Sequence, residues 1–359
     1  MLSTSDLLHL PYTPDLTEGG IAYACRSLAT TYGRMGGSQP RAPSGNRDYP
    51  AGTGTNVDRL RRIVAGVAAE LAFRRTLSEQ SIPFDVLGAT PFTHPDRYDV
   101  SLGGHRCHLK SFLITRRQQI ALIRQDPALV LQAPALVPLD QFAAEDHKPD
   151  DLYLFAFLLG VLAATREDVD RATAAGQPVY LIHPLPDEWA RPANWLPLEK
   201  LALKSECEAP ISVEIGGQNT GREFVTATLE LPPKKRVPVE QSFYSLAYVH
   251  AARRPGARIG LHSPLRGEAY IVPAHAWGNI WVYGMDILLT GWLTHEEYRR
   301  RSSVLPIGSR TFQYDQTRTK NLSGPVIELK PLGGLLAHVK EWEAERGRLA
   351  HLGAILSSR

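Results

Sequence analysis

The sequence predicts a mixed α/β (α+β) protein in which a core of one helix and a β-hairpin is followed by β-rich modules. Three features predict it: helical spacing of apolar residues after residue 55, an alternating stretch with a central glycine pair at 98–114, and short apolar runs between prolines beyond residue 150. A chain of 359 residues is long enough for two or more domains, each with its own core.

The first predicted element is a helix that begins near Asn56. A capping side chain there precedes Asp58, whose charge suits the positive end of a helix dipole. Glu70 falls on the same helix face as the apolar and small residues Ile63, Gly66, Val67 and Leu71. A glutamate on a helix is most often a solvated charge, but an unpartnered carboxylate on a core-facing stripe is costly. Glu70 is therefore a candidate functional residue, and Pro83 marks the end of the helix.

The second predicted element is a β-hairpin at residues 98–114 with Gly103 and Gly104 as its turn. In this register Asp99 lies opposite His108, about 5 Å away between Cβ atoms. Lys110 is two residues beyond His108 and points to the same face. The opposite, buried face would carry Val100, Leu102, Cys107 and Leu109. The hairpin therefore brings an aspartate, a histidine and a lysine to one surface.

The rest of the chain reads as β-rich. Composition predicts four segments: an N-terminal segment with a flexible Gly/Pro/Arg linker at 1–55, the core at 56–165, a β-rich module at 166–233, and a second β-rich module with a C-terminal helix at 234–359. Within the core, 152–159 is a continuous apolar run typical of a buried strand. A weak internal repeat, in which Trp189 and Tyr298 each follow a glutamate, is compatible with a duplicated unit.

The order of helix glutamate, hairpin aspartate and strand lysine resembles the PD-(D/E)XK (restriction endonuclease-like) nuclease superfamily, the core shared by many restriction enzymes and Holliday-junction resolvases. Glu70, Asp99 and Lys110 match its pattern and Ser111 extends it. The resemblance covers about residues 56–165 and is specific in arrangement, although the motif is short.

The sequence departs from the family pattern at His108, where the superfamily has a glutamate or aspartate. His108 could be a nitrogen ligand that favours manganese, a base, or a hydrogen-bond partner of Asp99. Asp96, in the literal Pro-Asp dipeptide, is an alternative to Asp99, but it lies in the loop before the strand. Zinc is not expected, because His105 and Cys107 point to the face opposite His108 on a regular strand.

The resemblance implies a metal-dependent DNA endonuclease or nickase that hydrolyses phosphodiester bonds, in a restriction or modification-linked defence system. Asp99, Glu70 and His108 would hold Mg²⁺ or Mn²⁺, which acidifies a bound water and acts as a Lewis acid. Lys110 would orient that water or neutralise developing charge. The alternative is a catalytically silent nuclease fold that binds nucleic acid or a protein partner. A metabolic hydrolase lacks support, since the chain has no Gly-rich phosphate loop, GxSxG or HExxH motif.

Basic residues gather around the predicted site, although the net charge of +3 by itself says little about nucleic acid. Arginine suits phosphate contacts because its guanidinium can donate two parallel hydrogen bonds. We expect DNA as the partner, together with proteins of a defence or modification system and a second copy of the chain in a homodimer. The expected DNA-binding residues are Arg62, Arg74, Arg106, Ser111, Arg116 and Arg117.

The remaining composition indicates a reduced, cytoplasmic protein without a membrane partner. Three widely separated cysteines, Cys25, Cys107 and Cys207, argue against a disulfide framework. The first residues lack a signal-peptide pattern, and the longest apolar run, 152–164, is too short to span a bilayer.

Overall fold

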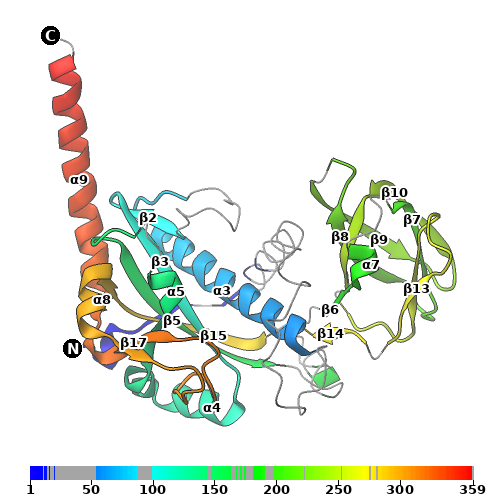
Figure 1. Ribbon diagram of the computed structural model, residues 1–359, viewed down its shortest axis with the longest axis horizontal. Helices are drawn as coiled ribbons and strands as arrows, with labels where there is room; N and C mark the ends of the chain where they lie inside the picture. The colour runs from blue at the N-terminus through cyan, green and yellow to red at the C-terminus, as the bar shows by residue number, and fades with distance from the viewer. Residues whose placement is uncertain are drawn as a thin grey trace. The chain divides into compact units, whose positions relative to one another are not determined.

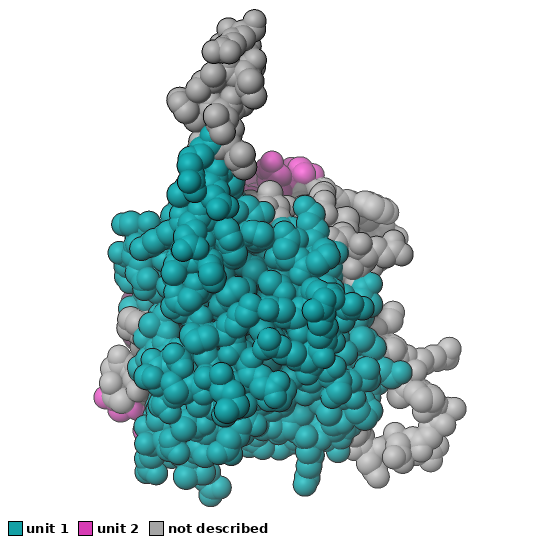
Figure 2. All heavy atoms as spheres, turned by 90° about the vertical axis from the view of Figure 1, so that its left-hand side faces the viewer, with its two compact units in different colours: residues 1–16, 65–161, 284–359 teal, residues 17–64, 162–283 magenta. Residues whose placement is uncertain are grey.

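The chain forms a mixed α+β structure with several separate sheets (Figure 1). It divides into two compact units: Met1–Leu16, Ala65–Val161 and Gly284–Arg359 make up unit 1, and Thr17–Val64 with Leu162–Tyr283 make up unit 2 (Figure 2). The computed structural model describes residues 1–10, 12–13, 16, 20, 54–86, 99–143, 147–162, 167, 170–171, 174, 181–190, 198–221, 223–251, 253–274, 276–279 and 282–357.

Unit 1 is built on a six-stranded sheet of order β1-β15-β5-β3-β2, with β18 paired to β15. The central strand β5 runs parallel to β3, from Cys107 opposite Leu152 to Ile114 opposite Leu159. Residues 152–159 are buried throughout, as the apolar run predicted, because a parallel strand is covered on both faces. The strands are β1 (Leu8–Leu10), β2 (Val100–Leu102), β3 (His105–Ile114), β5 (Leu152–Leu162), β15 (Val282–Thr294) and β18 (Lys330–Pro331).

The predicted hairpin is confirmed in position and register. Val100 lies opposite Cys107 and Leu102 opposite His105, with the two glycines at the turn. Gly103 and Gly104 both have left-handed backbone conformations, with φ of 57° and 89°. At the first of them a Cβ atom would lie 2.7 Å from the Cβ of Trp342 in α9 (Leu332–Ser357), so the turn requires glycine for two reasons.

The predicted helix is also confirmed, as α3 (Gly54–Glu79), which ends before Pro83. It packs along β3 with small side chains at the closest approach, where a Cβ on Gly66 would lie 3.3 Å from the Ser111 Oγ (Figure 1). Its buried face consists of Val64, Ala65, Ala68, Ala69, Ala72, Phe73 and Leu77.

Between β3 and β5 the chain passes through several short elements. One of them, β4, joins β16 and β17 in a separate three-stranded sheet of order β16-β17-β4. The remaining elements of unit 1 are η1 (Thr4–Asp6), α4 (Arg117–Gln125), η2 (Pro127–Gln132), β4 (Pro134–Pro138), α5 (Leu139–Phe142), α8 (His295–Arg301), β16 (Ser303–Leu305), β17 (Asn321–Pro325) and η4 (Val326–Glu328).

Unit 2 is β-rich, with two antiparallel sheets of order β10-β7-β12-β13 and β14-β6-β11-β8-β9 around one apolar core. Alternating burial along β7 and β8 follows the period of two expected for strands with one face inside. Its elements are β6 (Leu181–Pro184), α7 (Asp187–Ala190), β7 (Glu199–Ser205), β8 (Ile211–Gln218), β9 (Phe224–Leu231), β10 (Arg236–Phe243), β11 (Ser245–Ala251), β12 (Ile259–His262), β13 (Tyr270–Val272) and β14 (Gly278–Asn279).

The division into units differs from the predicted segments. Strands β10 to β14 join β6 to β9 in unit 2, so the expected boundary at 233/234 runs through one β-rich unit. The predicted second module, 234–359, is split because β15 enters the sheet of unit 1. Trp189 and Tyr298, the supposed repeat equivalents, lie in different units, and the described strands show no duplicated unit. Most of the predicted linker in 1–55 lies outside the described residues, while β1 at its start belongs to unit 1.

No helix in the described ranges is long and apolar enough to cross a membrane.

Candidate functional site

Two of the predicted acids meet between α3 and the hairpin. Asp99 immediately precedes β2, and its carboxylate accepts a hydrogen bond of 2.6 Å from the backbone N–H of Leu109 on β3. Glu70 lies one turn before Arg74 on α3, and the Arg74 guanidinium donates to the Glu70 carboxylate. Arg74 also donates to the backbone carbonyl of Asp99 at 2.9 Å. One arginine therefore joins the helix acid to the hairpin acid.

The two acids affect each other electrostatically. Burial and the charge of Asp99 raise the pKa of Glu70, Arg74 opposes both, and the net result is a pKa of about 7. The rise in pKa means that the positive charge of Arg74 does not fully compensate the two carboxylates. A further cation at this position would therefore be favourable, and we call Glu70 and Asp99 the acid pair.

The raised pKa of Glu70 predicts a pH-dependent stability. Between the ordinary value of 4.5 and about 7, the folded state holds more protons on Glu70 than the unfolded state does. The free energy of unfolding should therefore fall as the pH rises through this window. In EDTA, Glu70→Gln should flatten this slope and be more stable than wild type at pH 8 by up to about 3 kcal/mol.

Urea denaturation of both proteins from pH 4 to pH 8 measures this difference. Asp315→Asn is the matched control, because Asp315 is an exposed carboxylate in an arginine pair and should keep the wild-type slope. Parallel pH profiles of wild type and Glu70→Gln would contradict the electrostatic coupling.

The other predicted site residues lie along β3. Ser111 faces Gly66 of α3, and side chains alternate along a strand, so His108 and Lys110 point to the opposite side of β3. Lys110 Nζ donates to Gln141 Oε1 of α5 at 3.0 Å. The charges that shift the pKa of Glu70 are those of Asp99 and Arg74, whereas Lys110 is among those that shift the pKa of His108. The acid pair therefore forms one group, and His108 with Lys110 belongs to another.

His108 lies in a second cluster, with His147 and Asp151. One potential ligand atom from each of the three lies within 4.8 Å of the others. The His108 ring meets the His147 ring edge-on at 4.9 Å between centroids, and the ring of Tyr153 lies 5.5 Å away. We call His108, His147 and Asp151 the His–His–Asp cluster.

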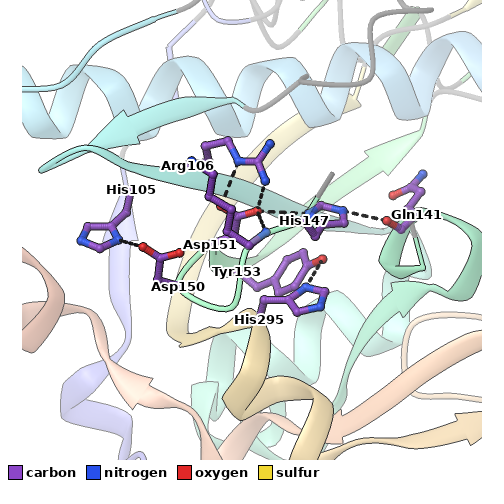
Figure 3. Close-up of polar contacts among 9 residues, drawn as sticks. His105, Arg106, Gln141, His147, Asp150, Asp151, Tyr153 and His295 are labelled. Carbon is purple, nitrogen blue, oxygen red and sulfur yellow. Dashed lines mark hydrogen bonds and ion pairs between the residues drawn. The ribbon is translucent and has the colours of Figure 1, made fainter. Parts of the chain in front are cut away.

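Asp151 is the charged centre of this cluster and is only 1% exposed. Arg106 donates to both of its carboxylate oxygens, from Nε at 2.9 Å and from Nη2 at 2.6 Å (Figure 3). The backbone N–H of Lys148 donates to the same carboxylate at 2.9 Å. Burial alone would raise the pKa of Asp151, but its contact with the His147 ring and the hydrogen bonds from Arg106 and Lys148 outweigh burial and hold it well below its ordinary value. Asp151 is therefore ionised at neutral pH.

His108 is buried without a hydrogen bond to its Nε2 atom among the described residues. Burial lowers its pKa to about 3, with further lowering by the charges of Lys110 and His147. The imidazole is therefore neutral at neutral pH, and one of its two ring nitrogens carries a lone pair that can serve as a ligand.

The expected DNA-binding arginines require correction where the structure describes them. Arg106 is committed to Asp151 in a buried pair, and Arg74, which is partly buried, is committed to the Glu70 carboxylate, so both guanidinium groups already have carboxylate partners within the protein. Arg116 is half-exposed and pairs with Asp315 at 2.8 Å.

The other expected residues divide as follows. Ser111 is half-buried against α3, and Arg117 begins α4. The side chain of Arg62 and the whole of Asp96 lie outside the described residues.

His147 and Asp151 were missed from the sequence. They reach His108 because β5 runs parallel to β3 with Leu152 opposite Cys107, which places Asp151 level with Arg106. The sequence did contain one signal for this cluster. Asp151 directly precedes the apolar run 152–159, and a carboxylate buried beside such a run needs a partner.

The chain matches no protein-family model, no curated protein and no solved structure.

Proposed function

We propose that this protein is a metal-dependent DNA endonuclease or nickase in which the acid pair holds Mg²⁺ or Mn²⁺. The observation that carries the proposal is the meeting of Glu70 and Asp99, from a helix and a hairpin, with the pKa of Glu70 raised to about 7. These are the two acids that the nuclease resemblance requires together. One or two carboxylates suffice for magnesium, which keeps several of its waters.

The order of elements adds support. Helix α3 is followed by an extended residue, Asp85, that pairs with Ser101, then by the hairpin and by a parallel strand. The helix glutamate, the hairpin aspartate and the strand lysine follow one another in the order on which the resemblance rests. A cytoplasmic restriction or modification-linked defence system, with a homodimer acting on DNA, is part of the same proposal and is supported by the resemblance alone.

The residues would divide the chemistry as follows. A bound ion would supply Lewis acidity and an acidified water for phosphodiester hydrolysis. The Leu109 N–H donates to one oxygen of Asp99 and so helps to fix the orientation of its carboxylate. Arg74 contacts both halves of the acid pair and would keep them at a constant separation. Lys110, which points to the opposite side of β3 and donates to Gln141, takes no part in this division.

A catalytically silent nuclease fold is the second candidate, and two observations favour it. Arg74 already places a positive charge on Glu70, where a divalent ion would bind. His108, in the position of the missing third acid, lies with Asp151 rather than with the acid pair. In that case the fold would bind nucleic acid or a protein partner without cleaving it.

Plasmid cleavage distinguishes the two candidates. We expect wild type to convert supercoiled plasmid to nicked or linear DNA with Mg²⁺ or Mn²⁺, and not in EDTA. A Glu70→Gln/Asp99→Asn double variant, purified in parallel, controls for contaminating nucleases and should be inactive. Equal conversion by wild type and the double variant would refute the proposal. DNA binding in an anisotropy assay without any metal-dependent cleavage would establish the silent fold instead.

A further inference from the structure

The His–His–Asp cluster has a feature that protein atoms alone do not explain. His108 is only 8% exposed, and its Nε2 has no hydrogen-bond partner among the described residues. A buried polar atom left without a partner costs free energy, and native proteins usually avoid it. His108 belongs to the same cluster as His147 and Asp151, and its neutral ring offers one lone pair.

The hydrogen bonds of His147 add a second feature. Its Nε2 lies 2.8 Å from the backbone carbonyl oxygen of Gln141, and because a carbonyl only accepts, Nε2 must carry the proton and donate (Figure 3). In the neutral ring Nδ1 is then a bare lone pair. That Nδ1 lies 3.3 Å from Oδ2 of Asp151, which is also a lone-pair atom. Two acceptors at this distance need a cation between them, either a proton on Nδ1 or a metal ion.

The spacing fits a metal ion. Nitrogen and oxygen ligands about 2.0–2.2 Å from a tetrahedral ion lie roughly 3.4 Å apart. His147 Nδ1 and Asp151 Oδ2 are 3.3 Å apart, which is close to this distance between two ligands of one ion. A histidine whose second nitrogen donates to a backbone carbonyl, and a carboxylate held by further donors, are the usual outer contacts of metal ligands. Gln141 supplies the first of these contacts and Arg106 the second.

We propose that His108, His147 and Asp151 form a binding site for a divalent transition-metal ion, separate from the acid pair. Two imidazoles and one carboxylate suit Zn²⁺, Co²⁺, Mn²⁺ or Fe²⁺ and do not suit Mg²⁺, which prefers oxygen. Zn²⁺ should bind most tightly of these four, because it readily accepts a tetrahedral set of nitrogen and oxygen ligands. Three protein ligands leave one position for a water or a substrate atom.

The charge of the site indicates which kind of ligand would occupy the fourth position on the metal ion. Asp151 and Arg106 neutralise each other, and both imidazoles are neutral as ligands, so a bound divalent ion would bring uncompensated positive charge into a buried site. An anion in the fourth position would reduce this excess. Hydroxide, or an oxygen of a phosphate or carboxylate, is therefore the favoured fourth ligand.

Metal titration of the full chain tests the site. Protein stripped with EDTA and dialysed should bind one equivalent of Co²⁺ with the visible absorption of a tetrahedral nitrogen–oxygen site, and Zn²⁺ should displace it. The variants His108→Gln, His147→Gln and Asp151→Asn should each weaken Zn²⁺ binding by at least about 10–100-fold, the loss that removal of an outer contact alone produces. Excess Mg²⁺ should not compete.

His295→Gln is the matched control, because His295 stacks on His147 at 5.2 Å between ring centroids but is not one of the three ligands. It should keep wild-type affinity. The Glu70→Gln/Asp99→Asn variant should also bind Zn²⁺ normally, so failure of the nuclease proposal would leave this site intact. If Asp151→Asn does not fold, the two histidine variants decide the result.

Two outcomes would overturn the proposal. If stripped wild type binds no stoichiometric Co²⁺ or Zn²⁺, a proton rather than a metal ion joins His147 to Asp151. If His108→Gln binds as wild type does, or His295→Gln loses as much affinity as His147→Gln, the metal binds elsewhere.

Discussion

Arg106→Met should lower the free energy of unfolding by about 3–5 kcal/mol, the usual cost of removing one partner of a buried ion pair. Arg106 is the only side chain of the described residues that donates to both carboxylate oxygens of Asp151, which is 1% exposed. Methionine keeps the apolar length of the arginine stem, so the loss would reflect the unpaired carboxylate rather than a cavity. Urea denaturation in EDTA, followed by circular dichroism, measures the change.

Arg116→Met is the matched control. Arg116 also pairs with an aspartate, Asp315, but 45% of the arginine side chain and 83% of the aspartate side chain are exposed. Exposed pairs contribute at most about 1 kcal/mol. A double variant, Arg106→Met with Asp151→Asn, should recover part of the loss because it removes the buried charge. Equal losses in Arg106→Met and Arg116→Met would contradict the assignment of Arg106 to a structural pair.

The elements that sequence reasoning predicted well are the ones determined by neighbouring residues. The hairpin follows from the alternation of residues 100–109 about two glycines, and its register is the predicted one. Helix α3 follows from three- and four-residue spacing and ends before Pro83. The meeting of Glu70 with Asp99 was expected from the resemblance, whose pattern joins a helix glutamate to a hairpin aspartate.

The features that were missed depend on pairing between distant parts of the chain. β15 begins at Val282 and joins the sheet of unit 1, so a division by composition could not assign residues 234–359. His147 and Asp151 reach His108 only through the parallel register of β5 with β3. The sequence does not reveal this register, so it predicted His108 beside Asp99 and Arg106 as a phosphate-binding residue. Alternation along a strand determines which residues share a face, but not which strand lies beside it.

Asp99→Asn should reduce metal-dependent cleavage by about 10³-fold, because loss of one carboxylate ligand removes several kcal/mol of charge stabilisation. Asparagine retains an oxygen that can accept from the Leu109 N–H, so the start of β2 should keep its position. Glu70→Gln should have a comparable effect, since Glu70 forms the other half of the acid pair. Initial rates of plasmid nicking at saturating Mg²⁺ measure both variants.

The double variant provides the sharper test of the acid pair. Groups that hold one ion act as a unit, so Glu70→Gln combined with Asp99→Asn should be little slower than either single variant. Asp315→Asn, which removes an exposed carboxylate paired with Arg116, should cleave at the wild-type rate. If the two single effects multiply in the double variant, the acids act independently. Unchanged DNA binding by anisotropy would show that the loss lies in the chemical step, as a metal ligand requires, and not in recognition of the substrate.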